Sequence, residues 1–274
     1  GVADDVPATR PAAALRVLAT PVAREKAAQA WSAAEDGQSG NLAVVGRSTP
    51  PERPARPEHP LLQSPGSMPK RRIGTLQGRI ALLHAVAHIE LNAIDLAADM
   101  IARFADAPDV AGDREDFIAD WSSVCDDEAR HFILISDRLG ELGFAYGDFP
   151  AHDGLWDAAM KTRFDIAARL SIAPLVLEAR GLDVTPGMIV KLDQAGDRKS
   201  AAVLENIYEE EGGHVAIGMK WLHHVARHRK KDSRTLCRGM VREHFTGPVK
   251  PPFNHAARQK AGLNLSFYED LSTL

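Results

Sequence analysis

Two short stretches of the sequence carry the residue types that bind metal ions. Glu128 and His131 stand three residues apart, and Glu211 and His214 repeat that spacing further along the chain. Residues three apart lie on one face of an α-helix, so each pair could present a carboxylate and an imidazole to one ion. One such match alone is weak evidence, because a chain of 274 residues with 11 His gives about 0.6 matches by accident.

A lone glutamate in apolar sequence precedes each pair, Glu90 before the first and Glu178 before the second. The order Glu, Glu-x-x-His, Glu, Glu-x-x-His is typical of the di-metal carboxylate site of ferritin-like four-helix bundles. Glu90 and Glu178 would be ligands from the lone-glutamate helices, and one histidine would bind each ion. The six expected ligands are Glu90, Glu128, His131, Glu178, Glu211 and His214, with Glu128 and Glu211 as the bridging pair.

Four carboxylates and two imidazoles suit iron or manganese, and the four negative charges balance two divalent ions. We expect two iron ions, with manganese or zinc as alternatives. Reduced iron reacts with O₂ or peroxide, which predicts an oxidoreductase, in particular a hydroxylase acting on a small-molecule substrate with an electron donor that the sequence does not identify. The alternative is a non-catalytic protein that binds or stores iron. The extensions at both ends argue against a minimal cage-forming storage unit.

Several neighbours could tune these ligands. Asp127 and Glu210 each precede a predicted ligand and could accept a hydrogen bond from the histidine of the opposite helix, with Arg130 pairing to those acids. Tyr208 and Cys125 each lie one turn before a predicted ligand. We expect Tyr208 to pack near the metals rather than to form a radical, and Cys125 to pack as a small apolar group.

Two further histidines share a helix with Glu90. His84 and His88 lie one turn apart, and His88 differs from Glu90 by about 200° around the helix axis. Structural roles are favoured for both. The alternatives are hydrogen bonds to the carboxylates that surround the ligands or to Asp183, or a place along an approach channel.

The helices that must position these residues are predicted from the spacing of apolar side chains. From residue 80 to residue 101, the stripe that carries Glu90 repeats every three or four residues. Gly143 and Gly181 are expected to end helices. The helices are expected at about 21–35, 75–104, 114–142, 155–179, 186–194, 197–228 and 233–245.

No strand pattern stands out, so the predicted class is all-α. We expect a ferritin-like four-helix bundle over residues 73–230. A short helix and a proline-rich extended arm would precede it in residues 1–72, and a helical extension and tail would follow in residues 231–274.

Three residues interrupt the helical pattern near the predicted ligands. Pro174 should kink or loosen its helix, either as a packing bend or to shape a substrate cavity. Gly212 and Gly213 each cost about 1 kcal/mol inside a helix. Close helix approach, access to the metal or a π-bulge would account for them.

Charge and composition restrict the partners. The net charge is −4, and seven prolines between residues 50 and 69 accompany six basic residues in the arm. An arm that wraps the bundle is favoured over an arm that binds RNA. Residues 227–231 are also basic, and together with the arm they resemble what a tRNA-modifying hydroxylase of related fold would use, which is the second alternative.

Neither a signal peptide nor a run of about 18 apolar residues is evident, and two Cys make no disulfide framework. We expect a cytoplasmic protein, and a homo-oligomer is compatible with the sequence. The arm's basic residues are Arg47, Arg53, Arg56, Lys70, Arg71 and Arg72.

Residues 127–131, Asp-Glu-Ala-Arg-His, resemble the Asp-Glu-x-Arg-His motif of bacterial multicomponent monooxygenase di-iron subunits. Further stretches stand out at His84, at residues 87–91, 177–183 and 211–214, and at 247–254, which read Gly-Pro-Val-Lys-Pro-Pro-Phe-Asn. Together they resemble an uncharacterised bacterial ferritin-like family, the domain-of-unknown-function family number 455. That resemblance implies a ferritin-like fold and a metal site, and it implies no particular substrate.

Overall fold

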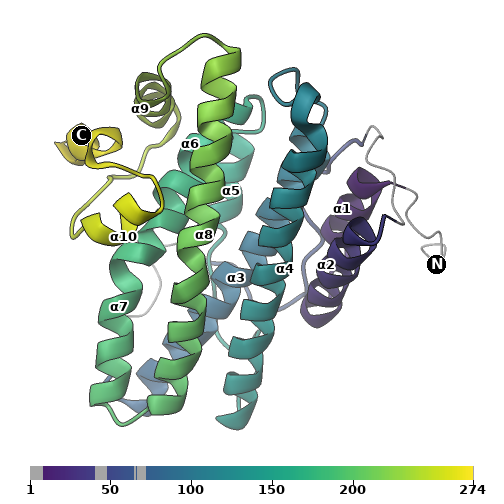
Figure 1. Ribbon diagram of the computed structural model, residues 1–274. Helices are drawn as coiled ribbons and strands as arrows, with labels where there is room; N and C mark the ends of the chain where they lie inside the picture. The colour runs from purple at the N-terminus through teal and green to yellow at the C-terminus, as the bar shows by residue number, and fades with distance from the viewer. Residues whose placement is uncertain (1–8, 41–47, 65, 67–71, 274) are drawn as a thin grey trace. The chain divides into compact units, whose positions relative to one another are not determined.

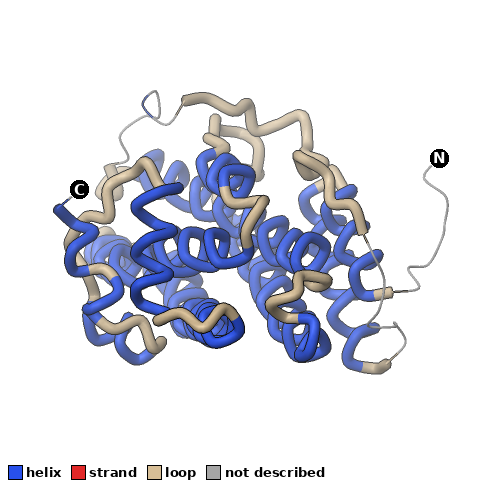
Figure 2. Tube along the Cα trace, turned by 90° about the horizontal axis from the view of Figure 1, so that it is seen from above, coloured by secondary structure: helices blue, strands red, loops and turns tan. Residues whose placement is uncertain are grey.

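The computed structural model of this chain describes residues 9–40, 48–64, 66 and 72–273. Helices dominate these residues, and no strand occurs among them (Figure 2). A single isolated bridge joins Leu62 to Ala151. The all-α class is therefore confirmed. The chain divides into two compact units, residues 1–58 with 90–133 and residues 59–89 with 134–274. The predicted division at residues 72 and 230 stays a prediction.

Two short helices begin the first unit, α1 (Arg10–Ala19) and α2 (Ala23–Gln38), and they pack against each other (Figure 1). The sequence predicted one helix here, and α1 was missed. Its start is nevertheless encoded locally, because the Thr9 hydroxyl accepts a hydrogen bond from the Ala12 amide and Pro11 occupies the first turn. The apolar stripe of α1 is only about two turns long, too short for periodicity to detect.

The long helices α3 (Leu76–Phe104) and α4 (Arg114–Glu141) lie close to their predicted bounds. In the first unit they meet where Sγ of Cys125 donates to the carbonyl of Ile94 at 3.6 Å. Gly143 follows α4 in the left-handed region at φ 81°, as expected for a helix end. The predicted stripe of α3, from residue 80 to residue 101, is buried. Local periodicity was therefore sufficient to place these two elements.

Helix α3 is also long and apolar enough, by length and composition, to cross a membrane. Its best 18-residue window has a mean hydropathy of 1.4, and 78% of that window is buried inside the protein. Charged residues interrupt the apolar sequence of this helix, so no unbroken run of about 18 apolar residues predicted it. A helix that is mostly buried in this way is typical of the core of a folded protein. The cytoplasmic location stays a prediction.

Buried charges join the N-terminal part of the first unit to α3. The ammonium group of Lys26 on α2 pairs with Asp95, and both side chains are fully buried. Arg56, from the proline-rich arm, donates to Oδ1 of Asn92 at 2.6 Å and lies 3.2 Å from Oδ2 of Asp95. The described part of the arm, 48–64, is not helical, as predicted. Arg56 contacts the protein, which supports the wrapping role for this part of the arm.

The expected basic residues Arg47, Lys70 and Arg71 lie outside the described residues. RNA binding by the arm stays a prediction.

In the second unit, the predicted single helix over 155–179 is wrong. The structure has α5 (Gly154–Lys161), α6 (Ile166–Ile172) and a π-helix (Ala173–Glu178). The break is stabilised on both sides. Asp165 caps α6 by accepting from the Ala167 amide at 2.6 Å. The buried Arg169 donates to the carbonyl of Ala159 at 2.7 Å, which satisfies the end of α5.

The predicted stop at Gly181 and the separate helix over 186–194 are also wrong. Helix α7 (Ala179–Gln194) continues through Gly181 and Pro186. It ends instead before Gly196, which adopts φ 77°. Packing along α8 (Arg198–His228) holds α7 together despite the missing amide of its proline (Figure 1). Helix α8 matches its predicted bounds.

The C-terminal extension is helical, as predicted. It contains α9 (Ser233–His244), α10 (His255–Lys260) and two short 3₁₀ segments (Leu265–Phe267 and Glu269–Thr273). Helix α9 packs on α6 and α8, and α10 contacts both α7 and α8 (Figure 1). The tail therefore lies against the helices of the second unit.

Pro174 and the glycines of α8 have different effects on the helices that contain them. Pro174 does loosen its helix, because the turn that contains it is the π-helix. Close helix approach occurs at Gly218, where an added Cβ would lie 2.6 Å from Cβ of Pro174. At Gly212 and Gly213, α8 stays α-helical, and no described neighbour lies within 4 Å of an added Cβ. Neither the predicted π-bulge nor close approach therefore accounts for the glycine pair.

Candidate metal centre

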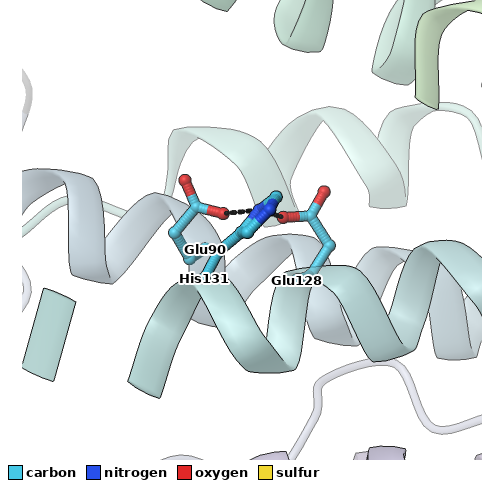
Figure 3. A group of neighbouring side chains, drawn as sticks. All are labelled: Glu90, Glu128 and His131. Atoms are coloured by element: carbon cyan, nitrogen blue, oxygen red, sulfur yellow. Dashed lines mark hydrogen bonds and ion pairs between the residues drawn. The ribbon is translucent and has the colours of Figure 1, made fainter. Parts of the chain in front are cut away.

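The first unit brings together Glu90 of α3 with Glu128 and His131 of α4. Nδ1 of His131 lies 3.2 Å from Oε2 of Glu90 and 3.4 Å from Oε2 of Glu128. Figure 3 shows the imidazole between the two carboxylates. The three side chains each offer one ligand atom, and those atoms lie within 4.8 Å of one another. At 4%, 1% and 0% exposure, the cluster is inside the protein.

Burial of this cluster changes its proton equilibria. Burial, reinforced by the charge of Glu128, raises the pKa of Glu90 from 4.5 to about 8. Burial lowers the pKa of His131, but hydrogen bonds to Glu128 and Glu90 outweigh it and raise that pKa from 6.5 to about 11. The cluster therefore favours positive charge between its carboxylates, supplied either by protons or by a cation.

The helical spacing of the sequence explains this convergence. Glu90 continues the buried stripe of α3, and Glu128 and His131 lie one turn apart on the buried face of α4. Cys125, one turn before Glu128, is buried, and burial raises its pKa above the ordinary range. A protonated thiol there agrees with the predicted packing role.

The second unit holds the other predicted ligands. On α8, Nδ1 of His214 lies 3.7 Å from Oε2 of Glu211, and His214 is buried. Glu178 ends the π-helix, and α7 follows it along α8. A Cβ at Gly181 would lie 3.6 Å from Oε1 of Glu211, so the first turn of α7 contacts this ligand. The sharing of one ion pair by all six residues stays a prediction.

The neighbouring polar residues are placed as follows. Arg130 pairs with Asp127 on the same face of α4, as predicted in part, and both are partly exposed. Glu210 is partly exposed on α8. The hydroxyl of Tyr208 accepts from Nδ2 of Asn254 at 3.0 Å, which ties it to the C-terminal segment. Orientation of the histidines by Asp127 and Glu210 stays a prediction.

His84 and His88 have the favoured structural role. The Gly147 amide donates to Nε2 of His84 at 2.9 Å, and His84 stacks on Tyr146 with ring centroids 5.4 Å apart. His88 bonds through Nδ1 to the Tyr146 hydroxyl and through Nε2 to the His152 carbonyl, each at 2.9 Å. Both histidines thus anchor the connection between α4 and α5.

Asp183 has a partner that the sequence did not predict, Arg258. Its carboxylate accepts from Nε of Arg258 at 2.8 Å and from Nη2 at 2.6 Å. The proposed bond between this aspartate and the histidines of α3 is not among these contacts. The available signal was that residues 177–183 and 247–254 both carry the family resemblance. Asp95, a charged residue inside the apolar stretch of α3, indicated that a buried partner is needed, but it did not identify that partner as Lys26.

The sequence of this chain is similar to that of a bacterial protein. An uncharacterized protein of Haemophilus influenzae is 41% identical over 209 residues, which cover 76% of this chain and 73% of the relative. No solved structure matches the chain, so the ferritin-like bundle stays a prediction. The family described as Protein of unknown function (DUF455) matches residues 19–269, and the chain belongs to that family.

Proposed function

We propose that this protein is a ferritin-like di-iron oxidoreductase that uses O₂ or peroxide to hydroxylate a small-molecule substrate. The observation that carries the proposal is the buried cluster of Glu90, Glu128 and His131, whose ligand atoms lie within 4.8 Å of one another. Carboxylate and imidazole ligands together suit iron and manganese. A bound pair of Fe(II) ions would supply two of the four electrons that reduce O₂ to water and the new hydroxyl group, the substrate would supply the other two, and an electron donor would re-reduce the iron.

The charge of the cluster supports a cation there. Two carboxylates in one buried place repel each other, and burial with Glu128 raises the pKa of Glu90 to about 8. A divalent ion would remove that cost by replacing the protons. Glu128 and His131 would bind from α4 and Glu90 from α3, with the protein excluding bulk water from all three.

The second Glu-x-x-His pair supports a two-ion centre. Glu211 and His214 repeat the spacing of Glu128 and His131. Gly181, in the first turn of the helix that follows Glu178, lies against Glu211. We therefore propose Glu178, Glu211 and His214 as the remaining ligands. The support is the repeated ligand order in the sequence.

Metal analysis of protein produced with added iron tests the site. We expect about two iron ions per chain, and Glu128→Gln should lose most of the metal. Glu115→Gln is the matched control, because Glu115 lies on the same helix and is exposed. Less than about one ion per chain, with no change in Glu128→Gln, would refute the site.

Spectroscopy tests the pairing and the chemistry. Protein loaded with Fe(II) without oxygen should show an exchange-coupled pair by Mössbauer and EPR spectroscopy. Two uncoupled ions would refute the shared centre. Rapid oxidation of the iron by O₂ or peroxide is expected in the wild type. If the iron binds but reacts with neither oxidant, the oxidoreductase proposal fails and the non-catalytic alternative holds.

A further inference from the structure

Residues 250–258, which we call the C-terminal latch, run from the proline-rich stretch into α10 and bond to α7. Nη1 of Arg180 donates to the carbonyls of Lys250 and Pro252, each at 2.9 Å. The side chain of Arg180 is partly exposed. The stretch from Lys250 to Pro252 is not helical, so its carbonyl groups make no bonds within a helix. The two bonds from Arg180 satisfy two of these carbonyls and hold the stretch against the first turn of α7.

The centre of the latch is a buried ion pair. Arg258 donates from Nε to Oδ1 of Asp183 at 2.8 Å and from Nη2 to Oδ2 at 2.6 Å, and both side chains are almost fully buried. The amide of Asn254 donates to the same Oδ1 at 2.9 Å. A two-pronged bond of this kind sets orientation as well as distance.

The guanidinium of Arg258 is also enclosed by aromatic rings. Its Cζ lies 4.9 Å from the ring centroid of Phe253 and 4.5 Å from that of Tyr268. Rings on a cation add attraction and keep water out. A buried ion pair often contributes little net stability against apolar residues of the same volume, so its geometric role is the more informative one.

The latch contacts α8, which carries Glu211 and His214, and α7, which begins directly after Glu178. On α7, Asp183 lies just over one turn after Glu178, and the π-helix that ends at Glu178 is a less regular turn. On α8, Asn254 bonds to Tyr208, one turn before Glu211. Between these contacts, Gly181 lies against Glu211. The latch therefore bonds to both α7 and α8 within about one or two turns of these predicted ligands.

We propose that the C-terminal latch positions Glu178 and Glu211 for metal binding, with Arg258 and Asp183 as the positioning residues. The inference rests on the proposed metal site. Without the latch, the ligand residues would still be present, but the turn of α7 that orients Glu178 and contacts Glu211 would be held less firmly.

Titration of the full chain with Mn²⁺ alone, followed by the EPR signal of the free ion, tests this. Arg258→Gln should bind Mn²⁺ about tenfold more weakly than wild type or worse. Arg258→Lys keeps the charge and should recover part of the affinity. Arg180→Gln, a change at a partly exposed side chain, should weaken binding in the same direction and serves if Arg258→Gln does not fold.

Arg234→Gln is the matched control. It removes an ion pair to Asp232 at the start of α9, outside residues 250–258 and outside the segment that carries Tyr268. Its Mn²⁺ affinity should equal that of wild type. Hydrogen exchange of amides 178–183, measured without metal, should be faster in Arg258→Gln and unchanged in the control.

The two proposals fail in different ways. If wild type binds neither Mn²⁺ nor Fe²⁺, the proposed function fails, and the latch proposal with it. If wild type binds Mn²⁺ and folded Arg258→Gln and Arg180→Gln bind it equally well, the latch proposal alone is overturned. Faster exchange over 178–183 without a change in affinity would also overturn it.

Discussion

Nδ1 of His131 lies 3.2 Å from Oε2 of Glu90, joining two helices through residues 41 positions apart. Glu128 approaches the same nitrogen, at 3.4 Å. Three ionisable groups are thus buried in one place, and their protonation is linked to folding and to metal binding.

The first prediction concerns pH in the absence of metal. Burial and Glu128 raise the pKa of Glu90 to about 8, and His131 reaches about 11 because its carboxylate partners outweigh burial. Both pKa values exceed those of the unfolded chain, so the folded protein binds more protons. Their stabilising contribution is full below the unfolded values of 4.5 and 6.5, and it is lost as pH rises to about 8 for Glu90 and to about 11 for His131. Stability in EDTA should therefore fall from about pH 5 to about pH 11, and the part due to Glu90 should be lost by about pH 8.

Urea unfolding in EDTA across that interval measures the effect. Glu90→Gln removes one titrating group, so its pH dependence should be flatter than that of wild type, whereas exposed Glu115→Gln should follow wild type. Mn²⁺ affinity should rise over the same interval, because binding displaces the protons. A wild-type stability that increases with pH relative to Glu90→Gln would contradict the assignment.

The second prediction concerns the buried pair of Lys26 and Asp95. Burial lowers the pKa of Lys26, opposed by Asp95, and both side chains have no exposure. Asp95→Asn should destabilise the protein by about 3 to 5 kcal/mol, because it leaves a buried ammonium without its counter-charge. The double change Lys26→Met with Asp95→Leu should cost much less.

Denaturant unfolding of Lys26→Met, of Asp95→Leu and of the double variant completes a thermodynamic cycle, and Asp95→Asn is measured beside them. A destabilisation of the double variant equal to the sum of the two single destabilisations would show that the two side chains do not depend on each other. Metal content should stay at the wild-type level in each folded variant, since neither residue belongs to the predicted ligand set.

The third prediction separates three glycines of α8. A Cβ at Gly218 would lie 2.6 Å from Cβ of Pro174, so Gly218→Ala should push α8 from the π-helix and cost about 1 to 3 kcal/mol. Gly212→Ala and Gly213→Ala meet no described neighbour within 4 Å and should stabilise by about 0.5 to 1 kcal/mol. Thermal unfolding of the three variants measures this. Equal shifts in all three would contradict the close approach at Gly218.

The fourth prediction concerns the connection between α4 and α5. His84→Leu removes the acceptor of the Gly147 amide and should cost about 1 to 2 kcal/mol. Hydrogen exchange at Gly147 should accelerate, while the amides of α9 keep their protection. His224→Leu serves as a control, because His224 packs on Trp221 of α8 instead. Unchanged exchange at Gly147 would show that His84 does not anchor the connection.

The sequence was sufficient where a local rule decides the outcome. The three-residue spacing of Glu128 and His131 sets their shared face on any α-helix, and the stripe around Glu90 sets its burial. The break between α5 and α6 was missed, because it depends on the cap at Asp165 and on the buried Arg169 reaching the end of α5. These side-chain bonds to the backbone compete with a continuous helix, and the spacing of apolar residues does not reveal them.

By itself, then, the sequence determined the all-α class, the bounds of α3, α4 and α8, and the faces that carry the predicted ligands. Only the tertiary structure decided which distant residues meet. Asp183 pairs with Arg258, 75 positions away, and Lys26 pairs with Asp95, 69 positions away. Such pairs depend on how one helix or segment packs against another, and the 3.6-residue period of a helix says which side is buried but not what covers it.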